Sequence, residues 1–155
     1  VDEKAAIAAL EAFQPVSQRF VQIKVGPYQI INDAYNANPD STIAALETFG
    51  RIKTSGRRIF IMGDMLELGQ YAIQGHKRVG KAVAQADIDR FYGVGTLTAY
   101  AIETAARAGL KAAYHFSTKS DLLAALKSDL KEGDTLLVKG SRGSRMEEII
   151  EGLSQ

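Results

Sequence analysis

The sequence predicts a three-layer α/β fold, in which a mostly parallel sheet of about six strands has helices on both faces. From residue 58 onward, strand-length apolar runs alternate with helix-length amphipathic segments, a pattern typical of right-handed crossovers between parallel strands. The run from Ile59 to Met62 is apolar at every position, as expected of a strand that is buried on both faces. The length of 155 residues suits one compact domain with a short appendage.

The start of the chain differs from the rest. Asp2 is placed to cap a short amphipathic helix, and Pro15 ends that helix. The apolar stripe of such a helix needs a partner, either in the main body or outside this chain. We therefore interpret residues 1–18 as an appendage or linker and residues 19–155 as the domain.

The elements of the domain follow in order. Two strands at residues 19–25 and 28–32 are joined through Gly26-Pro27, and they could form an antiparallel edge. A helix begins at Asn38-Pro39, because asparagine is a good N-cap and proline is favoured at the first helical position. The other strands are predicted at residues 58–62, 90–94, 112–116 and 135–138. The other helices are predicted at residues 72–86, 97–108, 120–130 and 145–153.

The composition excludes several classes of protein. Lys plus Arg number 19 and Asp plus Glu number 18, so the net charge is +1, which argues against nucleic acid or an anionic membrane as the main partner. The absence of cysteine excludes disulfides and thiolate chemistry and fits a reducing cytosol. No apolar run approaches the roughly 18 residues that span a bilayer, and the start does not resemble a signal peptide. We expect a cytoplasmic protein without membrane insertion.

Two glycine patterns imitate nucleotide-binding motifs. The segment from Gly75 to Ala82 nearly matches G-x-x-x-x-G-K-[ST], but it ends in alanine and therefore lacks the hydroxyl that ligates Mg²⁺. Residues 76–86 also read as continuous helix, with no strand before them. Gly93-Val-Gly95 lacks the third glycine of G-x-G-x-x-G, because position 98 is threonine. The chain therefore carries no complete triphosphate-binding motif.

In a doubly wound sheet, ligands bind beyond the carboxyl ends of the strands, so the loops at those ends are the candidate sites. Asp33 ends a strand, where a carboxylate can accept hydrogen bonds from a ribose diol. The helix N-terminus that follows offers free N–H groups to an anion. The alternative is that Asn38 and Asp40 serve the helix start while Asp33 makes a turn. Tyr35 and Asn36 crowd into the same loop and favour a binding role.

The loop at residues 139–145, KGSRGSR, is rich in glycine, hydroxyl groups and positive charge. Together with backbone N–H groups, Lys139, Ser141 and Arg142 could bind a carboxylate or a phosphate. The alternative is a flexible, solvated basic turn.

A third loop places Asp64 and Glu67 three residues apart, which could orient a metal ion or an ammonium group but more often marks a solvated turn. His76 could act as a general base by residue type, although a lone histidine is more often a surface or packing residue. His115 falls inside a predicted strand and reads as structural.

Three segments, taken together, resemble the C-terminal domain of the Mur ligases, of the type that adds D-alanyl-D-alanine to UDP-N-acetylmuramoyl-tripeptide. They are INDAYNANPDS (31–41), IMGDMLELG (61–69) and VKGSRGSRMEEII (138–150). Residues 15–19 resemble the segment that joins this family's central ATPase domain to its last domain, with Gln18 where the family usually has glycine. The resemblance implies that residues 19–155 are the Rossmann-like C-terminal domain and that residues 1–18 are the tail of the central domain.

The resemblance also implies a reaction. Enzymes of this family join an amine to a carboxylate at the expense of ATP, through an acyl phosphate. Their N-terminal and central domains hold the UDP-sugar and most contacts to ATP and Mg²⁺, while the third domain closes over ATP and delivers the dipeptide. A fragment limited to the third domain is expected to be inactive alone.

Roles carry over residue by residue on the same resemblance. Arg19 falls on the hinge arginine that reaches the ATP phosphates, which would make it the catalytic candidate, and Asp33 falls on the ribose-binding aspartate. The loop that faces the nucleotide contributes Asn36, Asn38 and Asp40. The incoming D-alanyl-D-alanine is expected at Lys139, Ser141 and Arg142. No residue of this domain is expected to ligate a metal.

Two other interpretations stay open at the level of the sequence. One is a stand-alone Rossmann-like module that binds a nucleotide or another anion without catalysis. The other is a glutamate-adding ligase such as a folylpolyglutamate synthetase. The YNANPDS segment argues against the second, because that family typically has a histidine before its Asn-Pro.

Overall fold

The computed structural model describes residues 18–155, so the predicted N-terminal helix lies outside the described residues. Six strands form one sheet in the order β1-β2-β6-β3-β4-β5. Their bounds are β1 (Val21–Val25), β2 (Tyr28–Asp33), β3 (Arg58–Gly63), β4 (Arg90–Val94), β5 (Ala113–Phe116) and β6 (Thr135–Lys139). β1 pairs antiparallel with β2, and every other pairing is parallel. This confirms the predicted sheet and its antiparallel edge.

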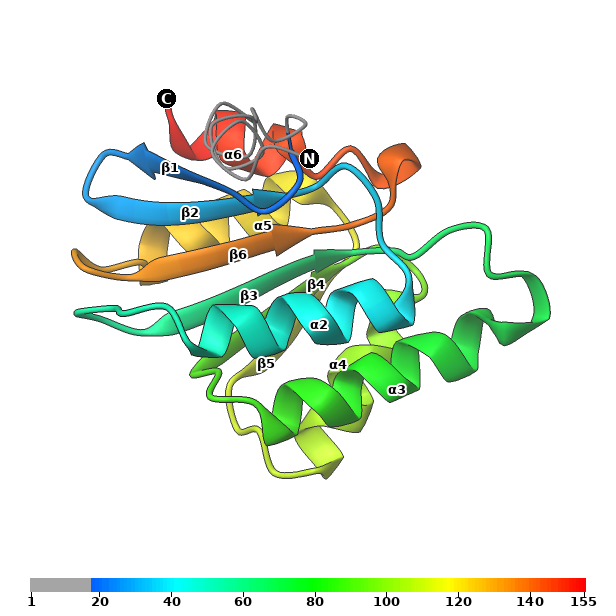
Figure 1. The fold of residues 1–155 in the computed structure, drawn as a ribbon. Helices are drawn as coiled ribbons and strands as arrows, with labels where there is room; N and C mark the ends of the chain where they lie inside the picture. The colour runs from blue at the N-terminus through cyan, green and yellow to red at the C-terminus, as the bar shows by residue number, and fades with distance from the viewer. Residues whose placement is uncertain (1–17) are drawn as a thin grey trace, which may run out of the picture.

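Helices cover both faces of the sheet (Figure 1). Their bounds are α2 (Pro39–Gly50), α3 (Ala72–Gln85), α4 (Thr98–Arg107), α5 (Lys119–Asp129) and α6 (Glu147–Leu153), with short 3₁₀ turns η1 (Gly69–Tyr71) and η2 (Arg142–Ser144). One hydrophobic core lies between the sheet and α2, α3 and α4, and a second lies between the sheet and α5 and α6. The predicted three layers are therefore confirmed.

Strand β1 begins two residues later than the predicted start at residue 19. Phe20 has a φ of 53°, which takes the backbone out of the extended conformation. Its N–H donates to Asp33 Oδ1 at 3.0 Å and so leaves the β1–β2 ladder, which ends at the pair Val21–Asn32. The chain therefore enters the sheet directly beside Asp33.

Helices α3 and α4 pack closely through Gly80, which faces Ala101. A Cβ atom at Gly80 would collide with the carbonyl oxygen of Ala101. The rejection of a phosphate-binding loop around Gly75 is confirmed, because this segment is the interior of α3. Gly80 thus serves a close approach of two helices.

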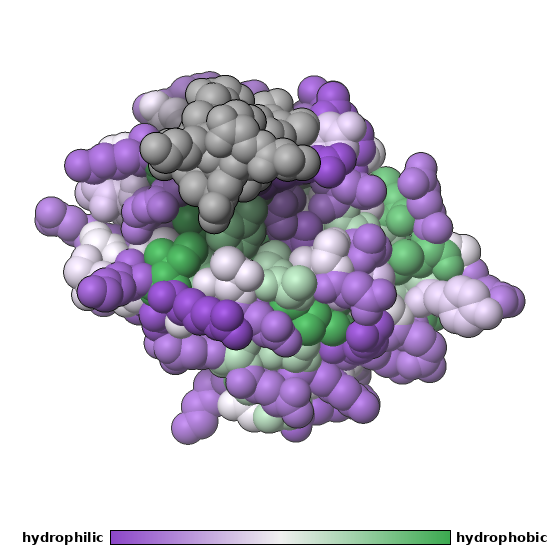
Figure 2. All heavy atoms as spheres, viewed as in Figure 1, coloured by the Kyte–Doolittle hydropathy of each residue, from purple (hydrophilic) through white to green (hydrophobic). Residues whose placement is uncertain are grey.

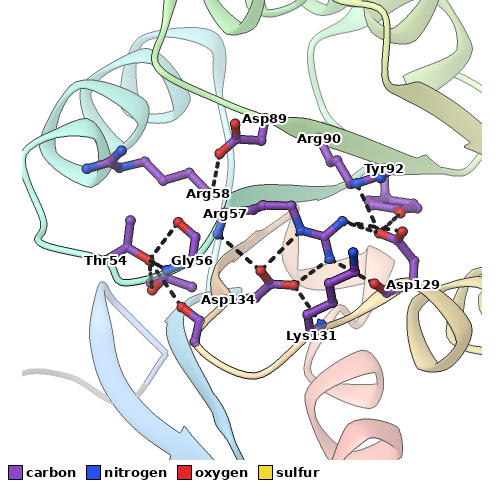
Figure 3. A network of polar contacts seen from close by, with 12 residues as sticks. Thr54, Gly56, Arg57, Arg58, Asp89, Arg90, Tyr92, Asp129, Lys131 and Asp134 are labelled. Carbon is purple, nitrogen blue, oxygen red and sulfur yellow. Dashed lines mark hydrogen bonds and ion pairs between the residues drawn. The ribbon is translucent and has the colours of Figure 1, made fainter.

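A polar network closes the sheet at the amino ends of β3 and β6 (Figure 3). Arg57 Nη2 donates to Asp134 Oδ2 at 2.6 Å, and the Arg57 guanidinium also reaches Asp129. Burial alone would raise the pKa of Asp134, but hydrogen bonds from Arg57 and from the N–H of Lys131 outweigh it and hold that pKa below its usual range. Burial and a hydrogen bond to Asp129 raise the pKa of the Tyr92 hydroxyl. These groups stabilise the fold by hydrogen bonds and ion pairs, and they lie at the opposite end of the sheet from the carboxyl ends of the strands.

The outer faces of α2 and α3 are covered mainly by hydrophilic side chains (Figure 2). Among the described residues, no helix combines the length and the apolar character needed to cross a bilayer. Within residues 18–155, four large hydrophobic side chains are exposed, and three of them lie between β3 and the first turn of α3: Leu66, Tyr71 and Ile73. Exposed hydrophobic side chains are therefore concentrated in this segment.

Candidate functional site

The carboxyl ends of β2, β6 and β3 point to one edge of the sheet, which we call the rim (Figure 1). Asp33 at the end of β2 is the register partner of Lys139 at the end of β6, and Lys139 is the register partner of Met62 on β3. The three loops predicted to carry chemistry follow these strands and therefore meet at the rim. Glycines stand where β3 and β6 end, and they leave room for Met146 and Ser144. A Cβ atom at Gly63 or Gly140 would come within 2.8 Å of side-chain atoms of both residues.

Asp33 and Lys139 form an ion pair at the centre of the rim. Lys139 Nζ lies 2.6 Å from Asp33 Oδ2 and also donates to the carbonyl oxygen of Asn36 at 3.0 Å. The side chains are 3% exposed for Lys139 and 14% for Asp33. The family resemblance assigns Asp33 to the ribose and Lys139 to the dipeptide. In the structure, the two side chains instead form an ion pair with each other. The ammonium of Lys139 is therefore engaged within the protein.

Ser141 joins the three rim loops. Its hydroxyl accepts a hydrogen bond from the N–H of Leu66 at 2.8 Å and donates to the carbonyl oxygen of Ala37 at 3.3 Å. Its own N–H donates to the carbonyl oxygen of Asp64 at 3.1 Å. Ser141 is buried, so this geometry makes it a residue that fixes the loops relative to one another.

Two arginines share one aromatic ring. The guanidinium carbon of Arg19 lies 4.4 Å from the centre of the Tyr35 ring, and that of Arg142 lies 5.4 Å from it. Both arginines are exposed, and such cation–π contacts orient a guanidinium without using its hydrogen-bond donors. The structure thus brings together Arg19 and Arg142, which the family resemblance assigns to nucleotide and dipeptide. The sequence pattern did not reveal Tyr35 as their common support.

In the loop between β2 and α2, one polar residue caps the helix and two others are exposed. Asn38 is the N-cap of α2: its side chain accepts from the N–H of Ser41, and Ser41 Oγ accepts in turn from the N–H of Asn38. This confirms the helix-start interpretation of Asn38. Asp40 is exposed and pairs with Arg78 at 2.8 Å, while Asn36 is exposed in the loop.

Two hollows lie side by side on the rim and share Tyr35 and Asn36. The first, which we call the Asp33 hollow, has a volume of about 310 Å³; it is lined by Arg19, Phe20, Asp33, Tyr35, Asn36, Asn38, Ser41 and Lys139. The second, the Glu67 hollow, has a volume of about 490 Å³; it is lined by Tyr35, Asn36, Leu66, Glu67, Ser141, Arg142 and Gly143. All the predicted site residues except Asp40 line one hollow or the other.

Asp64 and His115 form hydrogen-bonding contacts with the backbone. Asp64 Oδ1 accepts from the N–H groups of Leu97 and Thr98 at 3.0 and 2.8 Å and so caps the start of α4. Within residues 18–155, no cluster of three or more His, Cys, Asp or Glu side chains is placed to hold a metal ion. The exposed His115 contacts the carbonyl oxygen of Gly95 at 2.6 Å.

His76 is fully buried and holds one neutral tautomer. Its Nε2 accepts from the N–H of Met65 at 3.0 Å, so the ring proton lies on Nδ1, which contacts the carbonyl oxygen of Ala72 at 2.7 Å. Burial lowers the pKa of this imidazole below its ordinary value. The packing interpretation of His76 is therefore confirmed, and the residue anchors the loop after β3.

The titration of His76 predicts a loss of stability in mild acid. Because the pKa of His76 is lower in the folded state, the unfolded chain binds a proton near pH 6.5 that the folded chain does not bind. The free energy of unfolding should fall by up to about 1 kcal/mol between pH 6.5 and 5.5. Urea denaturation at both pH values measures this difference. His76→Gln should lose most of it, whereas His115→Gln should keep it; equal pH dependence in both variants would contradict the assignment.

The fold and the rim define the class of protein: an α/β domain whose polar loops meet at the carboxyl edge of a mostly parallel sheet. The family described as Mur ligase, glutamate ligase domain matches residues 18–142, and the chain belongs to this family. Several relatives and solved structures that the chain resembles are named as D-alanyl-D-alanine-adding ligases or as MurF.

The chain is 40% identical over 125 residues to the UDP-N-acetylmuramoyl-tripeptide–D-alanyl-D-alanine ligase of Bacillus subtilis, covering 80% of this chain and 27% of that protein. It is 37% identical over 155 residues to the Escherichia coli ligase of the same name, covering 98% of this chain and 32% of that protein. The crystal structure of MurF from Acinetobacter baumannii aligns with a TM-score of 0.86 and 28% identity, over 99% of this chain and 34% of that one. The chain thus spans about a third of the length of its relatives.

Proposed function

We propose that this chain is the C-terminal part of an ATP-dependent ligase that adds D-alanyl-D-alanine to UDP-N-acetylmuramoyl-tripeptide in peptidoglycan synthesis. The identity of 37% over nearly the whole chain to a ligase of that name carries the proposal. The rim supports it, because the predicted nucleotide and dipeptide residues other than Asp40 line two adjacent hollows at the carboxyl edge of the sheet. In this proposal the rest of the enzyme, its N-terminal and central domains, holds the UDP-sugar substrate and most of the ATP.

The Asp33 hollow has the chemistry for a nucleotide. A carboxylate offers about four acceptor positions, and Asp33 uses one for the N–H of Phe20 and one for Lys139, so positions remain for a ribose diol. The exposed guanidinium of Arg19 can bind phosphate oxygens in bidentate fashion. ATP would supply the phosphoryl group that activates the tripeptide carboxylate. In this proposal, Mg²⁺ is held mainly by the central domain.

The Glu67 hollow suits the dipeptide. Arg142 is exposed beside it and can pair with a carboxylate, while Ser141 and Lys139 position the surrounding loops through their hydrogen bonds. Of the three residues predicted for the dipeptide, Arg142 would therefore contact it directly, and Lys139 and Ser141 would hold the loops in place.

Closure of this domain onto the rest of the enzyme would bring both hollows to the reacting groups and exclude water from the acyl phosphate. The exposed hydrophobic side chains of Tyr71 and Ile73, in the segment between β3 and the first turn of α3, are suited to contact another protein surface. The proposed location is the cytoplasm, which the absence of cysteine fits.

An assay of phosphate release by the full-length protein tests the proposal. The full-length protein should release phosphate only when ATP, UDP-N-acetylmuramoyl-tripeptide and D-alanyl-D-alanine are all present. Arg19→Ala should lower turnover roughly 10- to 100-fold, because charge-assisted hydrogen bonds to phosphate are lost. Arg51→Ala, an exposed arginine at the far end of α2, is the matched control and should leave turnover unchanged. ATP hydrolysis by residues 1–155 alone, or equal turnover in the Arg19→Ala and Arg51→Ala variants, would overturn the proposed function.

A further inference from the structure

We propose that Glu67 binds the α-ammonium group of the incoming dipeptide, so that the Glu67 hollow recognises a zwitterion: Glu67 holds the ammonium end and Arg142 the carboxylate end. This inference rests on the proposed function and names the way in which one of its sites selects a substrate.

The two hollows differ in the charged side chains that they offer to a ligand. In the Asp33 hollow, Asp33 and Lys139 neutralise each other, which leaves Arg19 as the cation available to a ligand. In the Glu67 hollow, Glu67 and Arg142 are both exposed, and within residues 18–155 neither forms an ion pair. One hollow therefore offers a single positive charge, and its neighbour offers one charge of each sign.

A zwitterionic dipeptide matches the second arrangement. Free ammonium and carboxylate groups at the two ends of a short ligand would each meet a side chain of opposite charge. The Glu67 carboxylate would repel an anion such as a nucleotide phosphate. The same carboxylate would therefore favour the dipeptide over the nucleotide in the Glu67 hollow.

The shape and apolar character of the hollow fit the same ligand. Leu66 is 39% exposed and lies against Gly143, since a Cβ atom at Gly143 would come within 2.8 Å of Leu66 Cδ1. This apolar wall can cover the methyl groups of alanyl residues. A volume of about 490 Å³ lies within the range of small-molecule sites.

The backbone at Glu67 supports a role for its side chain. Glu67 has a φ of 65°, in the left-handed region where a glycine would avoid a cost of about 1–2 kcal/mol. Strain of this kind persists where the surrounding structure enforces it, and it often marks functional sites. Here a carboxylate occupies a position that its backbone disfavours.

Calorimetry on the full-length protein tests the inference, with UDP-N-acetylmuramoyl-tripeptide and a non-hydrolysable ATP analogue present. Three ligands are compared: D-alanyl-D-alanine, its N-acetyl derivative, which lacks the ammonium, and its C-terminal amide, which lacks the carboxylate. The unmodified protein should bind D-alanyl-D-alanine about 10-fold or more tightly than either derivative. Glu67→Gln should lose most of its preference over the N-acetyl derivative and keep its preference over the amide. Arg142→Met should show the opposite pattern.

Glu132→Gln is the matched control, because Glu132 is an exposed glutamate in the loop before β6, at the other end of the sheet. This variant should keep both preferences. If Glu67→Gln keeps its preference over the N-acetyl derivative while the unmodified protein is an active ligase, the inference is wrong and the proposed function stands. If the unmodified protein neither binds the dipeptide nor releases phosphate, both are overturned.

Discussion

Gly80→Ala should destabilise the domain by about 3 kcal/mol, although alanine is a better helix former than glycine. The new Cβ would collide with the carbonyl oxygen of Ala101, which belongs to the backbone of α4 and cannot move aside as a flexible side chain could. The collision forces α3 and α4 apart and opens the core that they share with the sheet. Gaining helix propensity returns only about 1 kcal/mol of this loss.

Urea denaturation of this chain measures the effect, with Gly50→Ala as the control. Gly50 is the last residue of α2, and a Cβ atom there would meet nothing within 4 Å. Gly50→Ala should therefore be neutral or slightly stabilising, while Gly80→Ala shifts the midpoint to lower urea. Equal midpoints for the two variants would show that the helices are not packed as described.

The order of the elements could be predicted from the sequence because hydrophobic periodicity is local. The buried strand at residues 58–62 and the helix opened by Asn38 are each specified by a few neighbouring side chains, and both are found. The start of β1 was less predictable, since it depends on the left-handed backbone of Phe20 and on a bond from Phe20 to Asp33, 13 residues away.

The candidate site was predictable in its location but not in its internal bonds. Strand ends of a parallel sheet share one edge, so polar residues after strands could be assigned to one rim. Asp33 and Lys139 pair only because β2 and β6 are neighbours, and the two residues are separated by 106 positions along the chain. Sequence patterns specify which residues end strands, but the order of strands depends on tertiary packing. For the same reason the burial of Ser141 could not be foreseen.

The second large effect is expected at the Asp33–Lys139 pair, and it should be asymmetric. Asp33→Asn keeps the shape and the acceptor for the N–H of Phe20 but leaves the Lys139 ammonium buried with only the carbonyl oxygen of Asn36. This variant should lose about 3 kcal/mol of stability. Lys139→Met should lose only about 1–2 kcal/mol, because the Asp33 carboxylate is more exposed than the ammonium and can be hydrated.

The double variant Asp33→Asn/Lys139→Met separates charge from packing. Since it leaves no buried charge unpaired, its loss of stability should be smaller than the sum of the two single losses, and close to that of Lys139→Met alone. Urea denaturation of the four proteins gives this coupling. In the full-length enzyme, the double variant should still raise the KM for ATP, because an amide cannot replace the carboxylate that accepts two ribose hydroxyls. Restored stability together with an unchanged KM for ATP would mean that Asp33 serves only to hold Lys139, and the Asp33 hollow would lose its assignment to the nucleotide.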